Sequence, residues 1–285
     1  MLNTDFFKEL DRFCFMVKKR VTTVYAGERR SIRQGKGSEI VDYREYMPGD
    51  DFKSVDWKLY GRTEKLYIRR FEEEKNLTTH ILIDASKSMD FGAVRKFDYA
   101  SMIGAGFAYL VTNENERFAL SLFADQLVEV MEPRRGKRHF LAAIDLLNKA
   151  PAAGTTRLDL CSEQYSKMIK SRSLVVLISD FMQPLPSIEE GIYKISRGSH
   201  DLIVVQVLDL KEKDLGWAEG DTKLYDLETG EMVHVYISPR FRELYRERFE
   251  VHSNGIRKAC EEVGADFFSI TSNTPIFDAF LAIVG

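Results

Sequence analysis

The chain has 285 residues, of which 44% are hydrophobic and 30% are charged, and its formal net charge is only -3. Its length allows one large domain with an extension or two modest domains, and its composition is that of an ordinary soluble globular protein. The near-neutral charge excludes a general affinity for polyanions, so we expect no nucleic-acid partner.

Residues 1–76 are predicted to form an N-terminal helix followed by a charged extension. The first twenty residues carry apolar side chains at helical spacing, which indicates an amphipathic helix. From residue 21 the pattern breaks at glycines and at Pro48-Gly49, and only short extended runs such as 65–68 remain. We expect an irregular α+β extension. The apolar positions of the helix are Phe6, Phe7, Leu10, Phe13, Cys14 and Val17.

Residues 77–285 are predicted to form a second domain, in which apolar strands alternate with helices. This alternation is typical of an α/β fold, a doubly wound and mostly parallel sheet covered on both faces. We expect strands 117–123 and 127–131 to pair antiparallel around a turn. A late hairpin insertion at 224–235 is indicated by its Glu-Thr-Gly turn. The other predicted strands are 78–83, 174–178, 202–208 and 266–270, and the predicted helices are 97–110, 139–149, 158–170, 188–196, 240–263 and 275–283.

Polar side chains follow the first of these strands. Asp84, Ser86 and Ser88 alternate along an extended loop, so one carboxylate and two hydroxyls are expected to converge at the carboxyl end of the sheet. Oxygen ligands suit a hard divalent cation such as Mg²⁺, whereas zinc would favour His or Cys. Further oxygens are expected from Thr155-Thr156 and Ser179-Asp180. A helix cap or turn explains each piece alone, but the set in this order predicts an ion site.

These residues resemble the metal-ion-dependent adhesion site of the von Willebrand factor A family. That family's pattern is Asp-x-Ser-x-Ser, a later Thr after Gly, and an Asp after a central strand, and the resemblance covers about residues 76–270. It implies that Asp84, Ser86, Ser88 and a threonine hold Mg²⁺, with Asp180 as a direct or supporting ligand. It also implies that a carboxylate from a protein partner fills the remaining coordination position.

Two details of this resemblance concern single positions. Thr156 is the preferred threonine over Thr155, because Thr156-Arg157-Leu158 is closer to the family's Thr-x-Leu entry into a helix. Ser179-Asp180-Phe181 departs from the Thr-Asp-Gly of many members. The identity of the threonine ligand therefore stays open between 155 and 156.

The extension carries a second resemblance. It reads Arg-Glu-Tyr-Met-Pro-Gly-Asp-Asp from Arg44 to Asp51, then Val-Asp-Trp at 55–57, and Arg-Arg-Phe-Glu at 69–72. This string resembles the bacterial domain-of-unknown-function family 58, whose members join such a segment to a von Willebrand A-like domain. The resemblance implies an association with MoxR-type AAA+ ATPases, as an adaptor in the assembly or maturation of other proteins.

The same extension is rich in charged side chains that can pair with one another. We expect its aspartates to pair with its arginines in a charged latch, or else to form a partner-binding edge. The aspartates are Asp50, Asp51 and Asp56, and the arginines are Arg44, Arg62 and Arg69.

Two functions compete for the predicted ion site. The first is a non-catalytic, Mg²⁺-dependent protein interaction module, and the second is a metal-dependent phosphoesterase with Asp84 as nucleophile. Such esterases usually place a second acid two residues after the nucleophile, where this chain has Ser86. No Gly-x-x-x-x-Gly-Lys-Ser/Thr loop is present, so ATP hydrolysis is not expected. We expect a protein that is not an enzyme; a metal-free scaffold is a third possibility.

Cysteine spacing and hydrophobic runs bear on the compartment. Cys14, Cys161 and Cys260 lie far apart and form no CxxC pair, which indicates neither a disulfide framework nor a thiolate zinc site. The N-terminus does not resemble a signal peptide, and no run approaches the roughly 20 apolar residues of a membrane span. We expect a cytoplasmic protein.

Overall fold

The computed structural model describes residues 40–284 apart from 49, 51, 72–77 and 199. The described residues fall into two compact units, one within 40–71 and one within 78–284. The helix expected in the first twenty residues lies outside the described part of the chain.

The smaller unit is built on two antiparallel strands, β1 (Ile40–Glu45) and β2 (Tyr67–Phe71). Helix α3 (Trp57–Thr63) lies between them in the chain and was not predicted. Val55 and Ile68 form a bridge and are fully buried, which gives the unit a small apolar centre.

The charged side chains of this unit follow the expectation only in part. Arg44 Nη2 donates to both carboxylate oxygens of Asp50, at 2.7 and 2.9 Å, as expected. Asp56 instead accepts hydrogen bonds from the N–H groups of Lys58 and Leu59 and caps the start of α3, because these amides have no partner inside the helix. Asp51 and the side chain of Arg69 lie outside the described residues.

The larger unit contains a six-stranded sheet in the order β10-β7-β6-β3-β4-β5. All neighbouring pairs are parallel except β4 and β5, which are antiparallel as predicted. The larger unit begins at the centre of the sheet with β3 and adds strands on both sides, which confirms the predicted doubly wound, mostly parallel sheet. The strands are β3 (Thr78–Asp84), β4 (Arg117–Phe123), β5 (Leu127–Arg134), β6 (Ser173–Ser179), β7 (Asp201–Leu208) and β10 (Asp266–Thr271).

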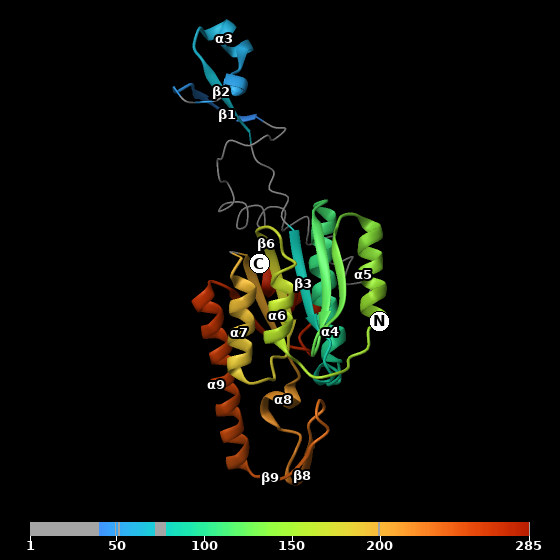
Figure 1. The fold of residues 1–285 in the computed structure, drawn as a ribbon. Helices are drawn as coiled ribbons and strands as arrows, with labels where there is room; N and C mark the ends of the chain where they lie inside the picture. The colour runs from blue at the N-terminus through green and yellow to red at the C-terminus, as the bar shows by residue number, and fades with distance from the viewer. Residues whose placement is uncertain (1–39, 49, 51, 72–77, 199, 285) are drawn as a thin grey trace. The chain divides into compact units, whose positions relative to one another are not determined.

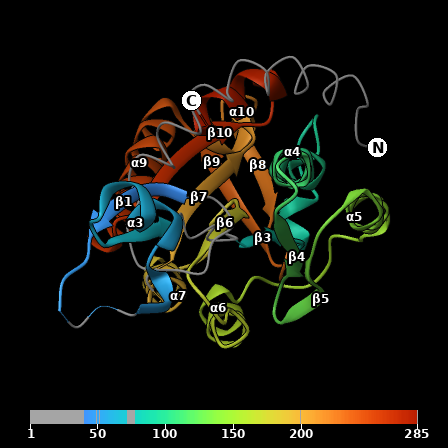
Figure 2. The same ribbon diagram turned by 90° about the horizontal axis from the view of Figure 1, so that it is seen from above.

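Helices cover both faces of this sheet (Figure 2). One layer contains α6 (Leu158–Ser166), α7 (Leu185–Ser196) and α9 (Pro239–Val263), and its apolar side chains form a continuous core with strands β3, β6 and β7. The other layer contains α4 (Lys96–Asn113), α5 (Lys137–Lys149) and α10 (Ile276–Val284). Burial on both faces explains why β6 and β7 are continuously apolar.

Helix α6 is shorter than predicted, since it ends at Ser166 and not at residue 170. The chain turns there so that Ile169 packs into the core before β6 begins at Ser173. The tertiary contact of Ile169 therefore outweighs the helical spacing of the sequence.

The last part of the unit adds α8 (Leu210–Asp214) and the predicted hairpin of β8 (Gly220–Tyr225) and β9 (Met232–Ile237). Gly230 has a φ of 76° in the turn, as the Glu-Thr-Gly pattern predicted. Figure 1 shows α8 and the hairpin together at one end of the central sheet. No helix in the described ranges is both long enough and apolar enough to cross a membrane.

Candidate metal centre

Asp84 is the last residue of β3 and is fully buried. Strands β3 and β6 run parallel and in register, with Ile83 opposite Ile178, so the residues that follow meet at the same edge of the sheet. Ser179 Oγ donates a hydrogen bond of 2.6 Å to Asp84 Oδ2. The sheet thus fixes the carboxylate of Asp84 beside the end of β6.

The loop after Asp84 is held by hydrogen bonds at each step. The Ser86 N–H donates to Asp84 Oδ1 at 2.9 Å, and the hydroxyls of Ser86 and Ser88 lie 3.0 Å apart. The N–H of Lys87 donates to the carbonyl of Gly154 at 3.0 Å. This bond joins the loop to the segment that carries the candidate threonines.

Thr156, and not Thr155, is the threonine that reaches Asp84. Its Oγ1 lies 3.4 Å from Asp84 Oδ2, although the two residues are 72 positions apart in the chain. Thr155 is exposed. Of the two candidate threonines, Thr156 is therefore the one that lies beside Asp84.

Asp180 lies beside this group but is held by a different network. Its Oδ2 accepts from Lys96 Nζ at 2.8 Å, and its Oδ1 accepts from the N–H of Met182 at 3.1 Å. Lys96 is fully buried and also donates to Glu212 Oε1 at 2.6 Å. Both oxygens of Asp180 are therefore engaged by Lys96 and by the backbone of Met182.

The electrostatics of the site are dominated by buried acids. Burial and the nearby charge of Asp180 raise the pKa of Asp84 to about 7, against the opposing hydrogen bonds from Ser179 and Ser86. Burial lowers the pKa of Lys96, but Asp180 and Glu212 outweigh it and raise that pKa above its usual value, so the ammonium stays charged. The ammonium of Lys96 thus lies between two carboxylates, those of Asp180 and Glu212.

The donor set fits a hard cation. Asp84 supplies a carboxylate, and hydroxyl oxygens come from Ser86, Ser88 and Thr156, which are ligand types that Mg²⁺ accepts together with retained waters. No cluster of three or more His, Cys, Asp or Glu side chains suited to a metal ion occurs among residues 40–71 and 78–284 as described. The candidate ligands of the cation are therefore mostly hydroxyl oxygens, with Asp84 as the carboxylate among them.

Glu228 was not predicted to belong to the site. Its Oε1 accepts from Thr156 Oγ1 at 2.9 Å, and its Oε2 accepts from the Thr156 N–H at 3.2 Å. The sequence showed this residue only as part of a hairpin turn. Lys96 and Glu212 were missed as well, because no local pattern connects them with Asp180.

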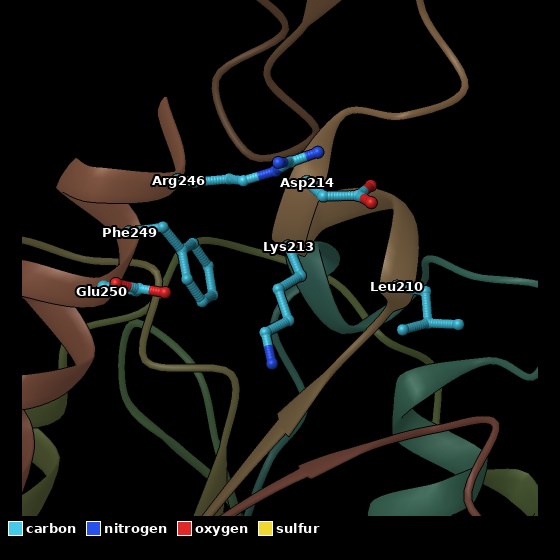
Figure 3. A pocket seen from close by; sticks show the side chains of 6 residues that line it. All are labelled: Leu210, Lys213, Asp214, Arg246, Phe249 and Glu250. Carbon is cyan, nitrogen blue, oxygen red and sulfur yellow. The ribbon is translucent and has the colours of Figure 1, made fainter. Parts of the chain in front are cut away.

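Two cavities lie elsewhere in the described residues. One of about 190 Å³ lies between α8 and α9, where Phe249 and Arg246 extend from α9 toward Lys213 and Asp214 of α8 (Figure 3). It is below the roughly 300 Å³ typical of small-molecule sites. The other, of about 520 Å³, is lined by basic residues such as Arg172 before the starts of β6 and β7. Open parallel sheets bind ligands at the opposite, carboxyl edge, where Asp84 lies.

Comparisons of the sequence give one family and uncharacterized relatives. The model of the family described as "Protein of unknown function DUF58" matches residues 42–255. An uncharacterized protein of Mycobacterium tuberculosis is 26% identical over 262 residues, which are 90% of this chain and 82% of that protein. The uncharacterized protein YeaD of Bacillus subtilis is 30% identical over 83 residues, which are 29% of this chain and 21% of that protein.

Two of the solved structures that this chain matches each cover nearly three quarters of it. The conserved hypothetical protein BatB from Bacteroides thetaiotaomicron has a TM-score of 0.49 and 13% identity, over 73% of this chain and 95% of that chain. The SpRpn10 VWA domain has a TM-score of 0.43 and 14% identity, over 72% of this chain and 93% of that chain.

Proposed function

We propose that this chain, which belongs to the DUF58 family, is a non-catalytic module that binds a protein partner through Mg²⁺. Asp84, Ser86, Ser88 and Thr156 would hold the ion. The observation that supports this most is the meeting of Asp84 and Thr156, from segments 72 positions apart, at the carboxyl edge of β3. A turn or a helix cap alone does not require that contact.

Each side chain has a distinct role in this proposal. Asp84 supplies the negative charge, and the hydroxyls of Ser86, Ser88 and Thr156 supply neutral oxygens. Asp180 stays bonded to Lys96 and keeps the end of β6 in place. A bound Mg²⁺ would supply a positive charge and an open coordination position for a carboxylate of the partner.

The proposed partner is a MoxR-type AAA+ ATPase or one of its clients, with the chain as an adaptor in the cytoplasm. The support for this partner is the association that the family resemblance implies. The support for the compartment is the cysteine usage, since Cys161 and Cys260 are free and buried thiols.

Phosphoester hydrolysis at Asp84 is less well supported by the geometry. Asp84 Oδ1 accepts from the Ser86 N–H, and Oδ2 accepts from the Ser179 hydroxyl. These bonds hold the carboxylate in place, and the position at which such esterases carry a second acid is occupied by Ser86. Binding is therefore the preferred function of this site.

A pull-down with the tagged full chain tests the proposal. Wild type with Mg²⁺ should retain a partner that is lost with EDTA and lost with Asp84→Asn, as identified by mass spectrometry. Asp145→Asn is the matched control, because Asp145 pairs with Lys149 on the exposed side of α5. Retention of the same proteins by wild type and Asp84→Asn would contradict it, as would magnesium-dependent turnover of generic phosphoesters by the purified protein.

A further inference from the structure

The turn of the β8–β9 hairpin is organised by Asp226. Its Oδ1 accepts hydrogen bonds from the N–H groups of Glu228 and Thr229, at 2.8 and 2.9 Å. The Gly230 N–H donates to the Asp226 carbonyl at 2.9 Å, and the positive φ of Gly230 closes the turn. This turn therefore presents Glu228 in a defined position.

Both carboxylate oxygens of Glu228 accept hydrogen bonds from a single residue of the metal centre. The Thr156 N–H and the Thr156 hydroxyl donate to its two oxygens, at 3.2 and 2.9 Å. The same hydroxyl lies 3.4 Å from Asp84 Oδ2, and its single proton serves the closer acceptor. Two carboxylates thus approach one hydroxyl from different segments, an arrangement that a cation would stabilise.

The hairpin can move without breaking a strand pair of the six-stranded sheet. Strands β8 and β9 pair only with each other in the described structure and share no ladder with the six-stranded sheet. A two-stranded hairpin is marginally stable by itself. Its displacement would therefore leave the central sheet intact. Several of its large apolar side chains are exposed, namely Tyr225, Met232, Val233 and Tyr236.

We propose that Glu228 occupies the coordination position that a carboxylate of the protein partner would take. The β8–β9 hairpin thereby caps the metal centre. This inference rests on the proposed function. A partner carboxylate then has to displace Glu228, and its apparent affinity is reduced by the fraction of molecules that are capped. Glu228 regulates access to the site and is not one of its permanent ligands.

Water relaxation of bound Mn²⁺ tests the cap directly, since this ion reports the number of exchanging waters. Glu228→Ala should still bind Mn²⁺, but with one additional exchanging water and a higher relaxivity than wild type. Acetate should lower the relaxivity of Glu228→Ala and leave that of wild type unchanged. Glu231→Ala is the matched control, because Glu231 is exposed on the same turn, and it should behave as wild type.

Amide hydrogen exchange gives a readout that needs no metal. In the metal-free protein, Glu228→Ala should raise the exchange rate of the Thr156 N–H by roughly tenfold or more, the factor for loss of one hydrogen bond to a charged group. Glu231→Ala should leave that rate unchanged. Equal Thr156 exchange in wild type and Glu228→Ala would overturn the cap.

The two proposals fail in different ways. Loss of Mn²⁺ binding in Asp84→Asn would support the metal centre. If wild type and Glu228→Ala then have the same relaxivity and respond equally to acetate, the proposed role of Glu228 is wrong. If wild type binds no Mn²⁺, the proposed function is wrong and the role of Glu228 falls with it.

Discussion

Ser179 Oγ donates a hydrogen bond of 2.6 Å to Asp84 Oδ2, and so joins the ends of two parallel strands. Both residues are fully buried. The bond holds the carboxylate where the Thr156 hydroxyl also reaches it, at 3.4 Å. The position of Asp84 is thus set by the sheet, and the loops add the remaining oxygens.

Substitution of the two adjacent threonines should separate their roles. Thr156→Ala should weaken Mg²⁺ binding by roughly tenfold or more, since changes around a metal site commonly cost 10–100-fold in affinity. Thr155→Ala should leave the affinity within about twofold of wild type, because Thr155 is exposed. Titration calorimetry of both variants checks this. A larger loss in Thr155→Ala would assign the ligand to the other threonine.

Loss of the Lys96 ammonium should destabilise the larger unit. Lys96→Met leaves Asp180 and Glu212 buried without their cation, and removal of one partner from a buried pair typically costs about 3–5 kcal/mol. Denaturant unfolding at neutral pH measures this loss. Lys149→Met is the control, because its ammonium pairs with Asp145 on the surface and should have little effect.

A second substitution tests the cause of that loss. Asp180→Asn in the Lys96→Met background should recover at least about 1 kcal/mol, because it removes the unpaired buried charge. A double variant that is as unstable as the two single changes added together would show that Lys96 acts through packing and not through charge.

The contribution of His80 to stability should be lost on mild acidification. This side chain lies within β3, where Tyr165 Oη is 2.9 Å from its Nδ1, and burial together with His200 lowers its pKa to about 4. The unfolded chain takes up a proton near pH 6.5, whereas the folded chain does so only near pH 4. The contribution of neutral His80 to the free energy of unfolding is therefore complete above pH 6.5. It is lost as the pH falls toward 4, and the loss amounts to at most about 3 kcal/mol.

Unfolding free energies between pH 4.5 and 7 check this dependence. As the pH falls, wild type should lose stability relative to His80→Gln, which keeps a polar side chain but does not titrate, whereas the raised pKa of Asp84 affects both proteins alike. Parallel curves for the two proteins would contradict the role of His80.

Gly104 allows α4 to approach β3 closely. A Cβ at this position would lie 2.6 Å from Ile83 Cδ1, so Gly104→Ala should cost about 1–3 kcal/mol by overpacking, of which the higher helix propensity of alanine offsets roughly 1 kcal/mol. Gly61→Ala is the control, because no heavy atom lies within 4 Å of its added methyl group and alanine favours the helix. Thermal unfolding compares the two variants. Equal effects would show that α4 and β3 have room to adjust.

Much of the larger unit was predictable because burial on both faces requires continuous apolar strands. That requirement located β3, β6 and β7, while the Glu-Thr-Gly turn located the hairpin. The short helix α8 was missed, although its capping box of Asp209 and Glu212 follows the Asp-x-x-Glu pattern. In the smaller unit, α3 was missed because its Asp56 cap lies among many other charges.

The candidate site was predictable only where its residues share a local pattern. Asp84, Ser86 and Ser88 follow one strand, and Thr156 and Asp180 precede or follow other regular elements. Lys96, Glu212 and Glu228 reach the site through tertiary contacts with partners 84, 116 and 72 positions away, and no spacing in the sequence encodes these contacts.

Calorimetric titration of Mg²⁺ into the metal-free protein tests the central claim most directly. Wild type should bind Mg²⁺ saturably, and this binding should be abolished by Asp84→Asn and unchanged by Asp145→Asn. Absence of binding to wild type, or equal binding to wild type and Asp84→Asn, would contradict it.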